Sequence, residues 1–153
     1  DGGLARCLHG SILSRRCYRI RLMTPQFDAI GMVVSDMTDA VSFYPLLGLA
    51  FPDGAESERN VELGLPGGAR LMLDSEELVR SFDPTFEPPC GAGRIGLAFL
   101  CEEPDEVDRL SDAVCEAGYR SERPPFDAFW GQRYATVLDP DGNGVDLFAP
   151  LSD

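Results

Sequence analysis

The sequence contains the same strand-turn-strand pattern twice, and this repetition limits the folds that the chain can adopt. The clearer copy runs from Trp130 to Phe148, where two apolar stretches flank the turn Asp139-Pro-Asp-Gly-Asn143. A weaker copy runs from Asn60 to Leu73 around Pro66-Gly-Gly. Alternating apolar residues on either side of a glycine that can take a positive φ predict a β-hairpin. We therefore expect a chain built from two related halves.

The residues before each hairpin repeat as well. Ala29–Asp36 and Gly96–Glu103 are apolar strands that end in an acidic residue, and apolar residues at helical spacing follow both. Gly48 and Gly118 then predict left-handed helix caps. Pro45 lies inside the first helical stretch and is expected to shorten or kink it, because its ring clashes with the carbonyl four residues back.

The length suits one domain with a shared core. We predict an α+β fold of two βαβββ modules, at residues 27–74 and 94–148. Residues 75–93 are rich in proline and glycine and predict a connector between the modules. Its aromatic residues, Phe82 and Phe86, are expected to pack against the body of the domain.

The first 26 residues differ from the rest in charge. They carry five arginines and one acidic residue and match neither module, so we interpret them as an extension outside the fold, with Met23 resembling a natural start. Their apolar runs are too short to span a membrane. The remaining residues hold eight arginines and 25 acidic residues, a formal charge of −17, and the chain has no lysine. Such a body repels nucleic acid and anionic membranes and either attracts cationic small molecules or simply remains soluble.

The cysteines point to a reducing, cytoplasmic setting. The chain has five, an odd number without Cys-x-x-Cys spacing, which predicts neither a disulfide framework nor a zinc site. Cys101 and Cys115 are expected to act as small apolar side chains in a strand and beside the buried stripe of a helix. The single histidine, His9, lies in the extension, which argues against a Cys-His nucleophile.

Four features together resemble the vicinal oxygen chelate superfamily: the doubled plan, Val34-Ser-Asp36, Phe43-Tyr44 with Leu47-Gly48, and the Asp139–Asn143 turn before Val145-Asp-Leu-Phe148. This superfamily includes glyoxalase I, extradiol dioxygenases, fosfomycin-modifying enzymes and bleomycin-binding resistance proteins. The resemblance covers residues 27–150. It implies eight strands that form an open barrel around a cleft, and chains that pair as homodimers. It identifies the fold and leaves the function open.

In the metal-using members, the resemblance places a divalent ion on four strand positions of the cleft. Carried over to this chain, these positions are Ala29, Gly96 (or Arg94 or Ile95 in a shifted register), Met72 and Asp146. Only the carboxylate of Asp146 is a good ligand for a hard or borderline ion. We therefore expect neither a metal nor another cofactor, as in the metal-free, bleomycin-resistance-like members.

The cleft that remains is a predicted small-molecule site. Its aromatic side chains can stack on a flat ligand, and its acidic groups can attract a cation. The candidate ligand-binding residues are Trp130, Phe129, Phe126 and Asp127 of an expected loop at Pro124–Gly131, together with Asp146, Met72, Glu62, Arg133 and Arg94. Each also has a structural interpretation: packing or a dimer contact for Phe129 and Trp130, an ion pair with Arg133 or Arg94 for Asp146, a solvated face for Glu62, and core packing for Met72. The Asp139–Asn143 turn is interpreted first as a turn, although its carboxylates could also bind calcium adventitiously.

Three functions follow from this reasoning. The leading hypothesis is a cytoplasmic, metal-independent protein that sequesters a cationic or heteroaromatic antibiotic, with no nucleic-acid or membrane partner. The alternative is a glyoxalase-like lyase or isomerase, or a dioxygenase-type enzyme, that uses the same cleft without metal or with metal at shifted positions. Asp146 or Glu62 would then be the general base. The third is a sensing or partner-binding homodimer whose cleft is vestigial.

Overall fold

The computed structural model describes residues 26–89 and 95–151. Its elements, in chain order, are β1 (Ala29–Val34), α1 (Met37–Phe43), the 3-10 helices η1 (Tyr44–Leu47) and η2 (Ala55–Ser57), β2 (Asn60–Gly64), β3 (Arg70–Ser75), α2 (Glu76–Phe82), β4 (Leu97–Leu100), α3 (Pro104–Glu116), β5 (Arg120–Ala128), β6 (Gln132–Leu138) and β7 (Gly144–Pro150).

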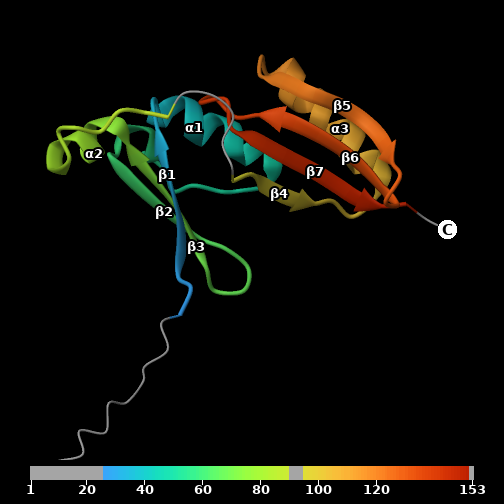
Figure 1. The fold of residues 1–153 in the computed structure, drawn as a ribbon, viewed down its shortest axis with the longest axis horizontal. Coiled ribbons are helices and arrows are strands. Elements are labelled where there is room, and N and C mark those ends of the chain that lie inside the picture. The colour runs from blue at the N-terminus through green and yellow to red at the C-terminus, as the bar shows by residue number, and fades with distance from the viewer. Residues whose placement is uncertain (1–25, 90–94, 152–153) are drawn as a thin grey trace, which may run out of the picture.

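The strands form two sheets, one from each module. Sheet A has the order β1-β3-β2 and sheet B the order β4-β7-β6-β5, and Figure 1 shows them as two lobes. In both sheets the first strand of the module pairs in parallel with its last strand, while the hairpin strands are antiparallel. The expected α+β fold of two repeated modules is therefore present, and its sheets do not close into a barrel.

The first module has one strand fewer than expected. Between α1 and β2 the chain forms turns and the short helix η2 in place of a strand. Pro52 and Gly54, which has φ 84°, favour a turn there over an extended backbone. The described residues therefore contain seven strands, whereas the superfamily resemblance implied eight.

The helix ends follow the local sequence signals. The side chain of Asp36 accepts a hydrogen bond from the backbone N–H of Asp39 at 3.1 Å and so caps α1. Helix α1 ends at Phe43, and Pro45 lies in the following 3-10 turn, as its missing N–H predicts. Gly48 closes that turn with φ 87°.

The segment between the modules is more ordered than its composition suggested. It contains α2, whose N-cap Ser75 accepts a hydrogen bond from the N–H of Leu78. The expectation that Phe82 packs against the body is wrong, because only Val79 of α2 is buried and Phe82 is 71% exposed. Phe86 is half-buried, and the guanidinium of Arg80 lies 5.7 Å from its ring centroid.

The two sheets share one core around α1, η1 and α3. Phe43 is fully buried and makes edge-to-face contacts with the rings of Tyr44 and Tyr119. Helix α3 covers one face of sheet B with Val107 and Val114 (Figure 1). Because Phe43 belongs to the first module and Tyr119 to the second, this core joins the modules.

The two described cysteines differ in environment. Cys101 is buried, as expected for a small apolar filler, and burial raises the pKa of its thiol. Cys115 is exposed, so the same expectation was wrong for it. The buried stripe of α3 passes through Val107, Ser111 and Val114, and this stripe leaves Cys115 on the solvent side.

A buried hydrogen-bond network at the Asp139–Asn143 turn also joins the modules. The Asp139 carboxylate accepts hydrogen bonds from the Tyr44 hydroxyl at 2.9 Å, from the backbone N–H groups of Asp141 and Asn143, and from the Asn143 amide. The Asp141 carboxylate accepts one from the N–H of Ser35. Burial and, secondly, the charge of Asp139 raise the pKa of Tyr44 above its usual range, so its hydroxyl stays a neutral donor.

Candidate functional site

Sheet B has one face covered by α3 and one open face, and the open face carries the candidate site. The strand register places Thr136 opposite Asp146 and Tyr134 opposite Phe148, with all four side chains on the open face. A cavity of about 290 Å³ lies there, which we call the Asp146 cavity. The described residues that line it are Ile95, Gly96, Glu122, Arg123, Tyr134, Thr136, Leu138, Gly142, Gly144 and Asp146.

Asp146 is held in position by a hydroxyl group. The Thr136 hydroxyl donates a hydrogen bond to Asp146 Oδ1 at 2.8 Å. Burial and then the neighbouring Asp146 raise the pKa of Tyr134 to about 12, although the positive charge of Arg123 acts in the opposite direction. The Tyr134 hydroxyl is therefore neutral at physiological pH and lies near the Asp146 carboxylate.

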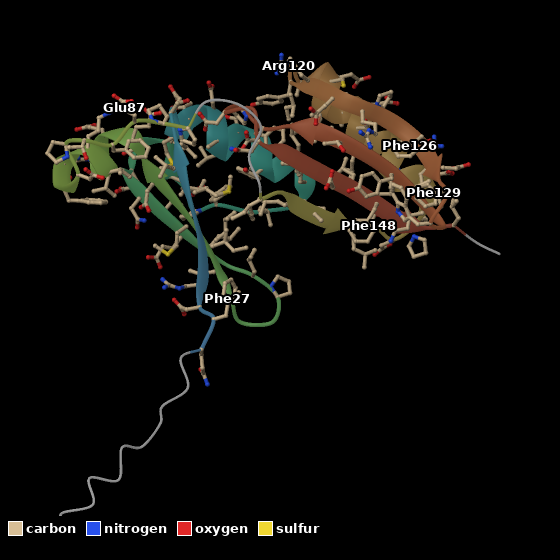
Figure 2. The ribbon with its side chains drawn as sticks, in the orientation of Figure 1. Phe27, Glu87, Arg120, Phe126, Phe129 and Phe148 are labelled. Carbon is tan, nitrogen blue, oxygen red and sulfur yellow. The ribbon has the colours of Figure 1, made fainter. Side chains whose placement is uncertain are left out.

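An aromatic cluster adjoins the cavity through Tyr134. It consists of Phe126, Phe129, Trp130 and Tyr134, whose edge-to-face contacts have ring centroids 4.9 to 6.1 Å apart. Phe129 is 97% exposed and Trp130 is 47% exposed. Figure 2 shows Phe126, Phe129 and Phe148 gathered toward one end of sheet B. Three of the aromatic residues predicted from the sequence thus form one cluster with Tyr134, but they are not among the described residues that line the Asp146 cavity.

Phe126 and Asp127 belong to a strand, which corrects the prediction of a loop at Pro124–Gly131. Strand β5 continues to Ala128, and only the following three residues turn before β6. The prolines are tolerated because β5 is the edge strand of sheet B and its pairing register shifts between Arg123 and Phe126.

Asp127 and Arg133 point away from the Asp146 cavity. Arg133 donates to both carboxylate oxygens of Asp108 on α3, at 2.8 and 3.0 Å, and to Asp127 at 3.0 Å. The strand register pairs Arg133 with Asp127, one residue out of phase with Tyr134. The structure therefore gives Arg133 partners other than Asp146, and Arg94 lies outside the described residues.

Glu62 and Met72 lie on sheet A, apart from the Asp146 cavity. They are opposite each other on β2 and β3, and the carboxylate of Glu62 forms an ion pair with Arg70. Arg70 also pairs with Asp28. Met72 is half-buried. The cleft that the sequence predicted around Met72 and Asp146 together is therefore divided between two sheets in the single chain.

The four carried-over metal positions do not form a metal-binding donor set. Met72 lies opposite Gly31 and Asp146 opposite Ala98, so both modules have the same register. This equivalence supports Gly96 as the counterpart of Ala29. Among the four positions only Asp146 offers an oxygen side-chain ligand, because Ala29 and Gly96 have no donor atom and Met72 has only a thioether. Across residues 26–89 and 95–151 no three His, Cys, Asp or Glu residues are grouped to hold an ion.

Four polar residues of the cavity were missed from the sequence: Glu122, Arg123, Tyr134 and Thr136. Thr136 and Tyr134 could have been found by counting back across the hairpin from Asp146, because the turn fixes the register. Arg123 carried no comparable signal. The register shifts on either side of it decide which face it reaches, and the sequence does not specify them.

These observations define a class of protein: two repeated strand-helix-strand modules with a cavity on an open sheet. The chain belongs to the Glyoxalase/Bleomycin resistance protein/Dioxygenase superfamily, whose family model matches residues 26–147. None of the curated proteins gives a significant match. In the described part of the chain, no helix has the length and apolar character needed to cross a membrane.

Several solved structures have the same fold. One is a glyoxalase/bleomycin resistance protein/dioxygenase family enzyme from Burkholderia phytofirmans, with 19% identity, a TM-score of 0.69, and coverage of 81% of this chain and 98% of that chain. A glyoxalase-related enzyme from Fulvimarina pelagi has 21% identity, a TM-score of 0.68, and coverage of 81% and 87%. A glyoxalase/bleomycin resistance protein/dioxygenase from Nocardioides has 22% identity, a TM-score of 0.65, and coverage of 87% and 88%. At these identities the likeness establishes the fold.

Proposed function

We propose that this chain is a metal-independent binding protein that holds a small organic molecule on the open face of sheet B. The proposed ligand is an antibiotic with a cationic or heteroaromatic group, which the protein sequesters without altering it. The observation that carries the proposal is the position of Tyr134, which belongs to the aromatic cluster and also lines the cavity that contains Asp146, a carboxylate held by the Thr136 hydroxyl.

The chemistry of the site supports this ligand class. Asp146 attracts a positively charged group or a hydrogen-bond donor, and its fixed orientation lowers the entropy lost on binding. The exposed ring of Trp130 offers a face for stacking or for a cation. The residues at the carried-over metal positions provide no site for a Lewis acid, so the proposal relies on stacking and charge alone.

The test is ligand titration followed by the fluorescence of Trp130, the only tryptophan of the chain. We expect quenching by members of a panel of cationic heteroaromatic compounds that includes bleomycin and proflavine. Asp146→Ala is expected to weaken binding by about 10- to 100-fold, since a hydrogen bond to a charged group contributes roughly 1.5–3 kcal/mol. The ligand should be recovered chemically unchanged by mass spectrometry.

Asp127→Asn provides the matched control for this experiment. It also replaces a carboxylate of sheet B, but one that faces Arg133 on the side of α3. We expect the affinity of this variant to stay within about twofold of the wild type. The proposed function fails if no member of the panel quenches Trp130, or if Asp146→Ala binds as tightly as the wild type.

We also propose that the protein acts in the cytoplasm as a homodimer. The free thiols of Cys101 and Cys115 support a reducing compartment. Exposed apolar residues of sheet B, Leu100 and Phe129, support a contact with a second copy. Light scattering should give twice the mass of the chain for the wild type, and Leu100→Asp combined with Phe129→Asp should shift it toward the monomer. A monomeric wild type contradicts the proposal.

A further inference from the structure

A second cavity adjoins the Asp146 cavity. It has a volume of about 530 Å³ and lies at the seam between β1 of sheet A and the starts of β4 and β7 of sheet B, and we call it the seam cavity. Ile95, Gly96 and Gly144 line both cavities. The two cavities are therefore neighbours that meet at these three residues.

The seam cavity is apolar. Met32 and Val33 of β1 and Phe86 of the inter-module segment form part of its wall. Two polar side chains line it in the described ranges, Tyr44 and Asn143, and both already donate to Asp139. The cavity thus offers hydrocarbon and aromatic surface, which favours an apolar group of a ligand.

The Asp146 cavity, in contrast, contains charges of both signs. Arg123 lines it together with Asp146, and its guanidinium lies 5.7 Å from the ring centroid of Phe126. Glu122 is a second carboxylate at the rim and is exposed. The ion pairs among the described residues use other arginines, namely Arg59, Arg70, Arg80, Arg109 and Arg133. Arg123 is therefore available to an anionic group of a ligand.

Two glycines, Gly96 and Gly144, lie at the boundary between the cavities. A Cβ atom at Gly96 would lie 3.3 Å from the carbonyl oxygen of Gly144 and 4.0 Å from Asp146 Oδ2. The two backbones therefore approach each other closely here. A side chain at Gly96 would add bulk at the boundary between the polar and the apolar part.

We propose that the ligand is an amphipathic zwitterion, with a cationic or donor group at Asp146, an anionic group at Arg123, and an apolar tail in the seam cavity. This inference rests on the proposed function and specifies the ligand class of the same site. A purely cationic ligand would leave Arg123 unused, and a ligand without a tail would leave the seam cavity without a role.

The test uses α-amino acids with straight alkyl side chains: 2-aminohexanoic, 2-aminooctanoic and 2-aminodecanoic acid. Binding is measured by isothermal titration calorimetry. We expect the affinity to rise by roughly threefold to fourfold for each added methylene, the equivalent of about 0.8 kcal/mol of apolar burial. Arg123→Gln should weaken binding of all three by about tenfold, whereas Arg109→Gln on α3 should leave it unchanged.

Two variants test the route of the tail. Gly96→Val should abolish the gain from chain length while the shortest ligand still binds. Val33→Phe, which fills the seam from the exposed side of β1, should have the same effect without altering Gly96. Retention of the chain-length gain in both variants, with circular dichroism showing that they are folded, would overturn the inference.

The outcomes separate this inference from the proposed function. If the three amino acids bind with equal affinity, or none binds, the amphipathic ligand is wrong. The proposed function still stands in that case, provided that the heteroaromatic panel quenches Trp130 and Asp146→Ala abolishes the quenching. If the affinity rises with chain length as expected but Asp146→Ala has no effect on either ligand set, the site lies elsewhere and both proposals fail.

Discussion

Replacement of Asp139 by alanine is expected to lower the free energy of unfolding by roughly 3–5 kcal/mol. The carboxylate is 5% exposed and accepts four hydrogen bonds, so its removal leaves the Tyr44 hydroxyl and two backbone N–H groups without their partner. A buried donor without a partner costs about 1–3 kcal/mol. The effect is large because one side chain satisfies donors from both modules.

Urea denaturation followed by circular dichroism measures this change. Tyr44→Phe removes one donor and leaves the others, so we expect a smaller loss of about 1–2 kcal/mol. In the double variant the two losses should be less than additive, since both remove the same contact. Asp53→Ala, at an exposed turn, is the control and should change stability by less than about 0.5 kcal/mol. A loss below 1 kcal/mol for Asp139→Ala would contradict the role assigned to the network.

The same turn shows how far the sequence predicted this fold. The two hairpins and their glycine turns depend on short-range signals, and both are present. The long-range contact of Tyr44 with Asp139 carried no local signal. Phe43 and Tyr44 are adjacent and both buried. The partner of the Tyr44 hydroxyl, Asp139, lies 95 residues away in the sequence, and how the modules dock determines that the two meet.

The candidate site was predicted in part for a similar reason. Asp146 and the rings at Phe126, Phe129 and Trp130 follow from strand alternation and from their position at one hairpin. The structure gathers the three rings into one cluster with Tyr134, which also lines the cavity of Asp146. Met72 was placed with them by the repeat. The repeat predicts which position a residue takes within its own module, but it does not predict how far apart the two modules lie. Met72 is therefore equivalent to Asp146 and yet lies on the other sheet.

The ion pairs show the other limit of the sequence argument. Asp127 was expected to serve the ligand from the Pro124–Gly131 loop, and Arg133 was a further candidate that could also pair with Asp146. Alternation within β6 instead directs the Arg133 side chain to the face of sheet B that α3 covers, where it donates a hydrogen bond to Asp108 of that helix. Whether a residue occupies an odd or an even position in its strand decides which face of the sheet its side chain reaches. The register shifts in β5 meant that these positions could not be derived for β5 from the residues of β6.

Alkaline pH is expected to destabilise the protein through Tyr44. The pKa of this tyrosine is raised in the folded state, so above pH 10 the unfolded chain releases a proton that the folded chain retains. The stability contribution of the neutral hydroxyl is therefore fully present below pH 10 and declines as the pH rises above it. The decline amounts to about 1.4 kcal/mol per pH unit, or roughly 2 kcal/mol between pH 10 and 11.5.

Urea titrations at a series of pH values between 8 and 11.5 test this mechanism. Tyr44→Phe should be less stable than the wild type at pH 8, but its unfolding free energy should fall less steeply above pH 10, because the ionising group is gone. Val114→Ala is the matched control, since it destabilises the shared core without removing a tyrosine and should keep the wild-type slope. If Tyr44→Phe and Val114→Ala show equal slopes, other groups cause the alkaline loss. The buried network would then hold the modules together without making their docking dependent on pH.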